Sequence, residues 1–173
     1  MQPEEATFLR DFFLQTLETE AKITRRVLEA LPAKGNDYRP DPKSRTGLEL
    51  GWHIAMVDAW FLESMFAAKF DPEKETSEVP KDVRSGAELA AFYDKNYIAR
   101  LGELRKLDAA ALTQVVNFFG VLDLPLVMYL SLLNNHQVHH RGQLSAYLRA
   151  MGAKVPAIYG GSADEPMQMG AGA

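Results

Sequence analysis

The spacing of apolar residues most constrains the fold of this 173-residue chain, because it follows the α-helical repeat in four stretches. In the first, from about Pro3 to Leu31, apolar side chains recur every three or four residues, as they do on one face of a helix. Three further stretches follow, over about 46–70, 85–107 and 125–151. Four amphipathic helices of these lengths predict an all-α four-helix bundle whose core is lined by one stripe from each helix.

Capping and helix-breaking residues indicate where these stretches begin and end. Thr46 and Glu49 have the spacing of a capping box, which opens the second helix. Pro125 suits the first turn of the last helix, and Gly152 suits a left-handed residue just after its end. The apolar piece at 115–125 is either an extended segment or a turn, because its glycine and proline oppose a continuous helix.

Length, composition and charge predict one domain and exclude several classes of function. A chain of 173 residues, 47% of them hydrophobic, can bury one sizeable core, so we expect a single domain over 1–173 with a poorly ordered tail from about residue 166. A net charge of −4 without a basic run argues against a nucleic-acid partner. The acidic N-terminus and the lack of an apolar run of about 18 residues predict a cytoplasmic protein without a membrane span. Because the chain has no cysteine, any thiol chemistry would need a thiol brought by the substrate.

Three of the four histidines occupy positions in the five-residue segment 136–140 of the last stretch. Their spacing places two of them on one face of the helix and the third on another. His136 and His140 are one helical turn apart, on a face that also carries Tyr129, so both should face the interior of the bundle. His139 is rotated away from them by about 80° and belongs on the flank. Two imidazoles at this spacing can hold one divalent ion between them. A stable site needs a third ligand, and His53 on the second helix is the remaining histidine.

A metal site is one of two interpretations of these histidines. A single histidine on an apolar face, such as that of His53, is usually a core residue whose hydrogen bonds are satisfied within the protein. Three buried imidazoles without partners would each lose hydration worth a few kcal/mol, and a shared cation removes that penalty more completely than hydrogen bonds do. We therefore predict that His53, His136 and His140 bind a metal. In the alternative, they are only polar groups in a bundle.

Other side chains around the histidines also have two interpretations each. Trp60 and Tyr129 are either walls of a pocket or ordinary core residues. Gln143 lies within about 40° of the direction of the histidine pair, so it either orients a ligand or makes a structural hydrogen bond. Glu49 would close the site as a fourth ligand, although the helix cap competes for its carboxylate. Arg141 should point to the flank, where we expect an ion pair with an acidic residue of another helix.

The segment HQVHHRGQLSAYLRAMGAKVPAIYG at 136–160, with GWHIA at 51–55, resembles the DinB-like (YfiT-like) family. In that family the fourth helix holds H-x-x-x-H followed by R-G-Q, the second helix supplies another histidine, and the ending YG-x-S-A-D-E matches YGGSADE here. The likeness extends from about Pro3 to Glu165. It implies an up-down-down-up bundle, often a homodimer, with a divalent metal such as nickel or zinc on the three histidines. It also implies that His139 is not a ligand.

The same resemblance suggests what kind of function to expect. Characterised relatives include thiol S-transferases and a thiol-dependent isomerase, which implies a metal-dependent transferase or hydrolase with a small-molecule substrate and a low-molecular-weight thiol as a candidate cosubstrate. The alternative is a non-catalytic, metal-stabilised or stress-response binding protein. The residues themselves exclude a ferritin-like di-iron centre and give no support to a zincin protease or to a common covalent nucleophile. No histidine has a glutamate three positions before it, Gln137 stands where a zincin protease has its glutamate, and no serine lies in a G-x-S-x-G motif.

Overall fold

The computed structural model describes residues 1–167, so most of the tail predicted to be poorly ordered lies outside the described residues. Five α-helices, three 3₁₀-helices and one two-stranded hairpin make up this part of the chain. In chain order they are α1 (Pro3–Glu29), α2 (Gly47–Phe66), η1 (Pro72–Lys74), α3 (Gly86–Asn96), η2 (Ile98–Lys106), α4 (Ala109–Thr113), β1 (Val115–Phe118), β2 (Leu122–Pro125), η3 (Leu126–Met128) and α5 (Tyr129–Ala150).

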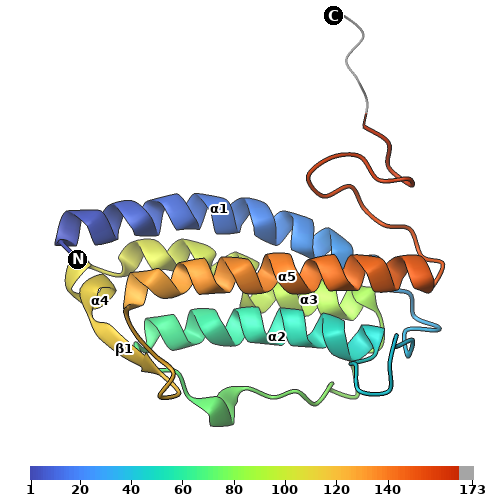
Figure 1. The fold of residues 1–173 in the computed structure, drawn as a ribbon, viewed down its shortest axis with the longest axis horizontal. Coiled ribbons are helices and arrows are strands. Elements are labelled where there is room, and N and C mark those ends of the chain that lie inside the picture. Colours follow the sequence, from blue (N-terminus) through green and yellow to red (C-terminus); the bar gives the residue numbers. More distant parts are fainter. Residues whose placement is uncertain (168–173) are drawn as a thin grey trace, which may run out of the picture.

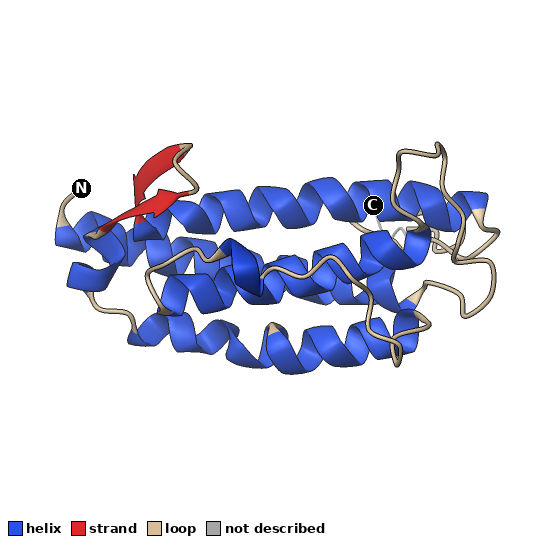
Figure 2. Ribbon diagram, turned by 90° about the horizontal axis from the view of Figure 1, so that it is seen from below, coloured by secondary structure: helices blue, strands red, loops and turns tan. Residues whose placement is uncertain are grey.

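Four of these helices form the predicted all-α bundle. α1 and α5 run in one direction and α2 and α3 in the other, which is the up-down-down-up arrangement (Figure 1). α1 packs against α5 and α3, and α2 packs against the same two helices. Because α2 and α3 are parallel, the chain between them, 67–85, must return along the length of the bundle, and it does so across the outside (Figure 2). None of the helices in the described part of the chain is long and apolar enough to cross a membrane.

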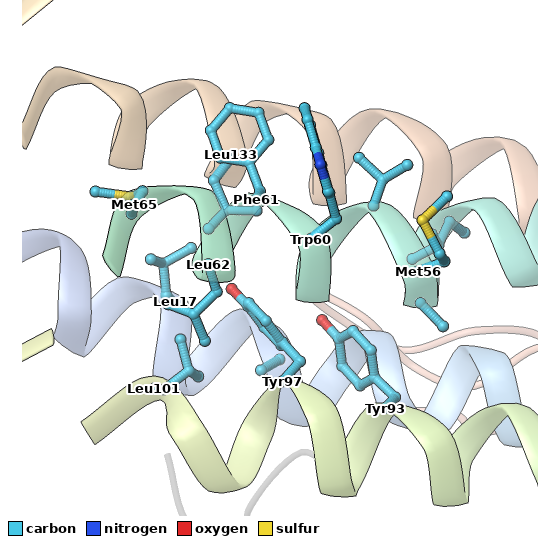
Figure 3. Packing of buried hydrophobic residues seen from close by; sticks show 14 of the residues in the cluster. Leu17, Met56, Trp60, Phe61, Leu62, Met65, Tyr93, Tyr97, Leu101 and Leu133 are labelled. Carbon is cyan, nitrogen blue, oxygen red and sulfur yellow. The ribbon is translucent and has the colours of Figure 1, made fainter. Parts of the chain in front are cut away.

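The core is filled by the apolar stripes of all four helices. Leu17 of α1, Leu62 of α2 and Leu133 of α5 are fully buried. Tyr93 and Tyr97, in α3 and at its end, point toward α2 from the other side (Figure 3). Burial of large apolar side chains is the main favourable contribution to folding. It holds α2 and α5, which carry the histidines, in a fixed relation to each other.

The ends of the helices agree with the sequence patterns at some positions and differ at others. The side chain of Thr46 accepts from the backbone of Glu49 and the carboxylate of Glu49 accepts in return, so the capping box is confirmed. Gly152 has φ +72° after α5, as predicted. Pro125 was wrongly placed in the first turn of the last helix, because it ends β2, and α5 begins at Tyr129.

The ambiguous segment at 115–125 is an antiparallel hairpin, β1–β2. Phe119 and Gly120 form its turn with φ +55° and +73°, and Val121 N–H donates to the carbonyl oxygen of Phe118 at 2.9 Å. Positive φ at both central residues of this turn matches the twist of a hairpin, but a phenylalanine is strained there. Backbone strain of this kind is often found at functional sites, so the side of the bundle that the ring of Phe119 covers is a candidate for one.

Candidate metal centre

His53 on α2 and His136 and His140 on α5 each bring one ring nitrogen to the same place. The Nε2 atom of His53 lies 3.3 Å from Nε2 of His136 and 3.3 Å from Nε2 of His140. One ligand atom of each residue lies within 4.8 Å of the others. Metal–nitrogen bonds of about 2.0–2.1 Å in tetrahedral geometry separate two ligand nitrogens by about 3.3 Å. Both distances from His53 therefore fit one small divalent ion, and the third pair of nitrogens lies within 4.8 Å.

Hydrogen bonds determine which nitrogen is free on two of these rings. Nδ1 of His136 lies 2.9 Å from a carboxylate oxygen of Asp58, and Nδ1 of His140 lies 2.7 Å from the amide oxygen of Gln143. Both partners are acceptors, so each Nδ1 carries the hydrogen and each Nε2 presents a lone pair. A hydrogen on Nε2 of His53 can satisfy one of these lone pairs but not both. Within the described residues Nδ1 of His53 is buried without a partner. A shared cation would satisfy all three Nε2 atoms, which hydrogen bonds among the rings cannot do.

Burial keeps two of the histidines neutral. Loss of hydration lowers the pKa of His53 to about 3 and that of His140 to about 4, and the positive charge of Arg45 contributes to both shifts. A metal binds the neutral form of imidazole. At neutral pH no proton has to be displaced from these two rings before an ion can bind.

Asp58 holds the ring of His136 in place, and the sequence analysis did not identify this residue. Its side chain is fully buried in α2 and accepts hydrogen bonds from Nδ1 of His136 and from the hydroxyl of Tyr93, each at 2.9 Å. Burial raises the pKa of Asp58, and the hydrogen bond from His136 opposes that shift. The signal available in the sequence was an aspartate in the otherwise apolar run AMVDAWF. Buried carboxylates of this kind are costly without a partner, so their partners are worth identifying.

Replacement of Asp58 is expected to weaken metal binding at the three histidines. We expect Asp58→Ala to raise the metal dissociation constant about 100-fold and Asp58→Asn about 10-fold, since an amide oxygen still accepts the Nδ1 hydrogen but lacks the charge. Competition with a chromophoric chelator measures both constants. Asp82→Asn, at an exposed position, is the matched control. Equal affinities in all four proteins would show that Asp58 does not position His136.

The remaining predicted residues lie at different distances from this cluster. Gln143 contacts His140 directly, and the ring of His139 lies beside that of His140 with centroids 4.7 Å apart. Glu49 is held by the helix cap and lies 3.8 Å from Arg39, so its carboxylate is not part of the histidine cluster. Tyr129 is a core residue whose hydroxyl donates to the carbonyl oxygen of Val116 at 2.7 Å, and this bond ties α5 to the hairpin.

A cavity of about 360 Å³ opens beside the histidines, and its wall is aromatic. Trp60 and Phe119 line it and stack on each other with their rings 6.1 Å apart and inclined by 15°, and Phe61 and Phe118 also line it. The strained turn of the hairpin thus presents Phe119 to this cavity. An apolar pocket with a few polar groups at one end is the usual form of a small-molecule site. We call it the aromatic cavity.

The side chain of Arg141 does not point to the flank of the bundle, as predicted, but it does pair with an acidic residue of another helix. It lies in the interior between α5 and α1, only 1% exposed, rather than on an open flank. Its guanidinium pairs with the carboxylate of Glu20 at 2.6 Å and donates to Thr24 Oγ1 at 3.1 Å. The predicted ion pair with an acidic residue of another helix is therefore present. Arg141 also donates to the hydroxyl of Tyr159, which fastens the segment after α5 to the bundle.

Comparisons with known proteins give the family. The model of the DinB family matches residues 4–170, nearly the whole chain. The chain belongs to the DinB family. A curated member, the uncharacterized protein YrdA of Bacillus subtilis (strain 168), is 28% identical over 161 residues, which cover 92% of this chain and 93% of that protein.

Two solved structures of DinB-like proteins have the same fold. A DinB-like protein from Bacillus cereus ATCC 10987 superposes with a TM-score of 0.69 at 29% identity, covering 85% of this chain and 95% of that one. The DinB-like protein YjoA from Bacillus subtilis superposes with a TM-score of 0.67 at 19% identity, covering 89% and 98%. The family that the sequence resemblance implied is thereby confirmed.

Proposed function

We propose that this DinB-family protein binds one divalent transition metal, nickel or zinc, through Nε2 of His53, His136 and His140. The observation that carries the proposal is the convergence of three ring nitrogens, with Nε2 of His53 3.3 Å from Nε2 of His136 and of His140, and with Nδ1 of His136 and of His140 already engaged by an acceptor. A structural cluster of histidines would instead pair each buried nitrogen with a donor or acceptor of the protein.

We further propose that the site is catalytic, in a metal-dependent thiol S-transferase or hydrolase. Three neutral imidazoles leave the full charge of the ion in place and leave at least one coordination position open. When bound, the ion would lower the pKa of a coordinated water or thiol toward about 7. The protein's own residues would position the ligands and bind the substrate. Asp58 and Gln143 fix the two rings of α5, and the aromatic cavity would hold the substrate and exclude water.

The alternative is a non-catalytic protein in which the ion only fastens α2 to α5. That role is favoured when a fourth protein ligand closes the coordination sphere. Among the described residues, Glu49 was the candidate, and its carboxylate is bound to the backbone of Thr46 at 2.7 Å. An open position next to a cavity therefore supports the catalytic proposal. The cytoplasmic location, the homodimer and the thiol cosubstrate stay predictions.

Turnover that depends on the metal would distinguish the two functions. The protein loaded with nickel or zinc is incubated with a low-molecular-weight thiol and 1-chloro-2,4-dinitrobenzene. In the transfer, a carbon–sulfur bond forms, the carbon–chlorine bond breaks, chloride leaves and the thiol proton passes to solvent. We expect a rate above the uncatalysed reaction that disappears on chelation and returns with the metal. If chelation lowers the stability and no thiol and electrophile pair gives turnover, the alternative holds.

A further inference from the structure

A second cavity, of about 620 Å³, lies on the other side of His140 and is lined by cationic side chains. It opens between the N-terminal end of α2, the C-terminal half of α5 and the chain at 39–45. Arg39, Lys43 and Arg45 line it, and Glu49 is the one carboxylate among its lining residues. We call it the cationic cavity.

The positive charges of this cavity are poorly neutralised by the protein. Among the described residues the side chains of Lys43 and Arg45 form no ion pair or hydrogen bond, and Arg39 reaches Glu49 only at 3.8 Å. Glu49 is already engaged by the backbone N–H of Thr46. Exposed pairs at such distances contribute little. A cavity with three cations and one committed carboxylate attracts an anion from solution.

The two cavities lie on either side of the histidines and share one of them. Leu132 of α5 lines the aromatic cavity, Tyr147 lines the cationic cavity, and His140 lines both. By helical rise, these first two residues are about 22 Å apart along α5. The chain that connects α2 to α3 covers both cavities, through Glu75 on one and Ser77 on the other. A molecule that occupied both would therefore pass directly over the three histidines.

We propose that the substrate has an anionic group at one end, held in the cationic cavity, and an apolar part held in the aromatic cavity. Its reacting atom then lies at the three Nε2 atoms. The inference rests on the proposed function, and it names the class of substrate that the site takes. Arg45 is the central residue of the anion subsite, since it lines the cationic cavity and its side chain forms no ion pair among the described residues. Guanidinium and ammonium groups bind carboxylates and phosphates through charge-assisted hydrogen bonds.

A matched pair of thiols tests the subsite on the nickel-loaded protein. 6-Mercaptohexanoate and 6-mercaptohexanol have the same chain and differ in the terminal group, and the absorption of a thiolate bound to nickel reports binding of either. At low ionic strength we expect the carboxylate to bind at least about tenfold more tightly, and added salt to reduce the difference. In Lys43→Gln/Arg45→Gln protein the two thiols should bind equally, with the affinity of the alcohol unchanged.

A control variant and a calorimetric titration distinguish failure of the anion subsite from failure of the proposed metal-dependent function. Lys22→Gln/Lys95→Gln protein, which loses two exposed charges elsewhere, should keep the preference for the carboxylate. Equal binding of both thiols in the unaltered protein, or a preference that survives in Lys43→Gln/Arg45→Gln protein, would overturn the subsite. If neither thiol gives an absorption band, thiol binding at the metal fails. Calorimetric titration of metal-free protein with inorganic phosphate then tests the subsite alone. Weaker binding in the Lys43→Gln/Arg45→Gln variant supports the subsite, and equal binding refutes it.

Discussion

His136→Ala protein is expected to lose its bound metal, whereas the unaltered protein, purified without an affinity tag, should hold close to one equivalent of a transition metal. The substitution removes one of three converging nitrogens and leaves the buried carboxylate of Asp58 with only the hydroxyl of Tyr93 as a partner. We expect less than about a tenth of an equivalent to remain, because two imidazoles form a much weaker site than three. Elemental analysis of both proteins measures the difference directly.

The neighbouring histidine provides the matched control for this experiment. His139 lies on the same helix and its ring contacts that of His140, but it is outside the cluster of three, so His139→Ala protein should keep its metal. His140→Ala serves as a second test if His136→Ala fails to fold, since Nδ1 of His140 bonds to Gln143 at the edge of the site. Circular dichroism checks that each variant is helical. Unaltered protein that holds no metal after dialysis against nickel or zinc would refute the proposed centre.

Arg141→Met is expected to lower the free energy of unfolding by about 3–5 kcal/mol, because it leaves one partner of a buried ion pair without the other. Arg141 is 1% exposed and Glu20 11% exposed, and the guanidinium is also bonded to Thr24 Oγ1. A methionine fills much of the space of the arginine side chain but cannot neutralise the charge of Glu20. Urea unfolding of metal-free protein, followed by circular dichroism, measures the change without interference from metal binding.

Two companion variants separate loss of the buried pair from loss of an arginine. Arg149 pairs with Asp164 at the surface with 52% of its side chain exposed, and Arg149→Met should cost at most about 1 kcal/mol. Adding Glu20→Gln to Arg141→Met should recover part of the lost stability, because the uncompensated charge is then gone. A cost for Arg141→Met no larger than that for Arg149→Met would contradict the structural role assigned to the pair.

Local patterns in the sequence were sufficient for most of the fold. Helical periodicity located the four helices of the bundle, although the third stretch, predicted as one helix to about residue 107, is α3 followed by the 3₁₀-helix η2. The capping box at Thr46 and the left-handed Gly152 were correct because they depend on neighbours along the chain. The hairpin at 115–125 was left open as an extended segment or a turn. Its strands are stabilised by pairing with each other and by the hydroxyl of Tyr129, which donates to Val116. The turn residues Phe119 and Gly120 lack the Asn-Gly or Asp-Gly pattern that signals a hairpin, so the pairing could not be read from the sequence.

The sequence predicted one part of the candidate site, and only the tertiary structure showed the other. The i, i+4 spacing of His136 and His140 follows from helix geometry alone, and His53 was the remaining histidine that could complete the set. Whether the three rings meet depends on how α2 packs against α5, and so does the contact between His136 and Asp58. Asp58 was missed because an isolated aspartate in an apolar helix shows no partner until the other helix is in place.

By itself, the sequence determined that this chain forms an all-α bundle and that two of its histidines share a helix face, because both follow from the repeat of a single helix. Tertiary structure alone decided what each face of α5 meets. Since α5 packs against both α1 and α2, its buried arc is wide enough to direct the histidines toward α2 and Arg141 toward Glu20 of α1. A flank position on an isolated helix thus became an interior position, because a bundle helix has two neighbours.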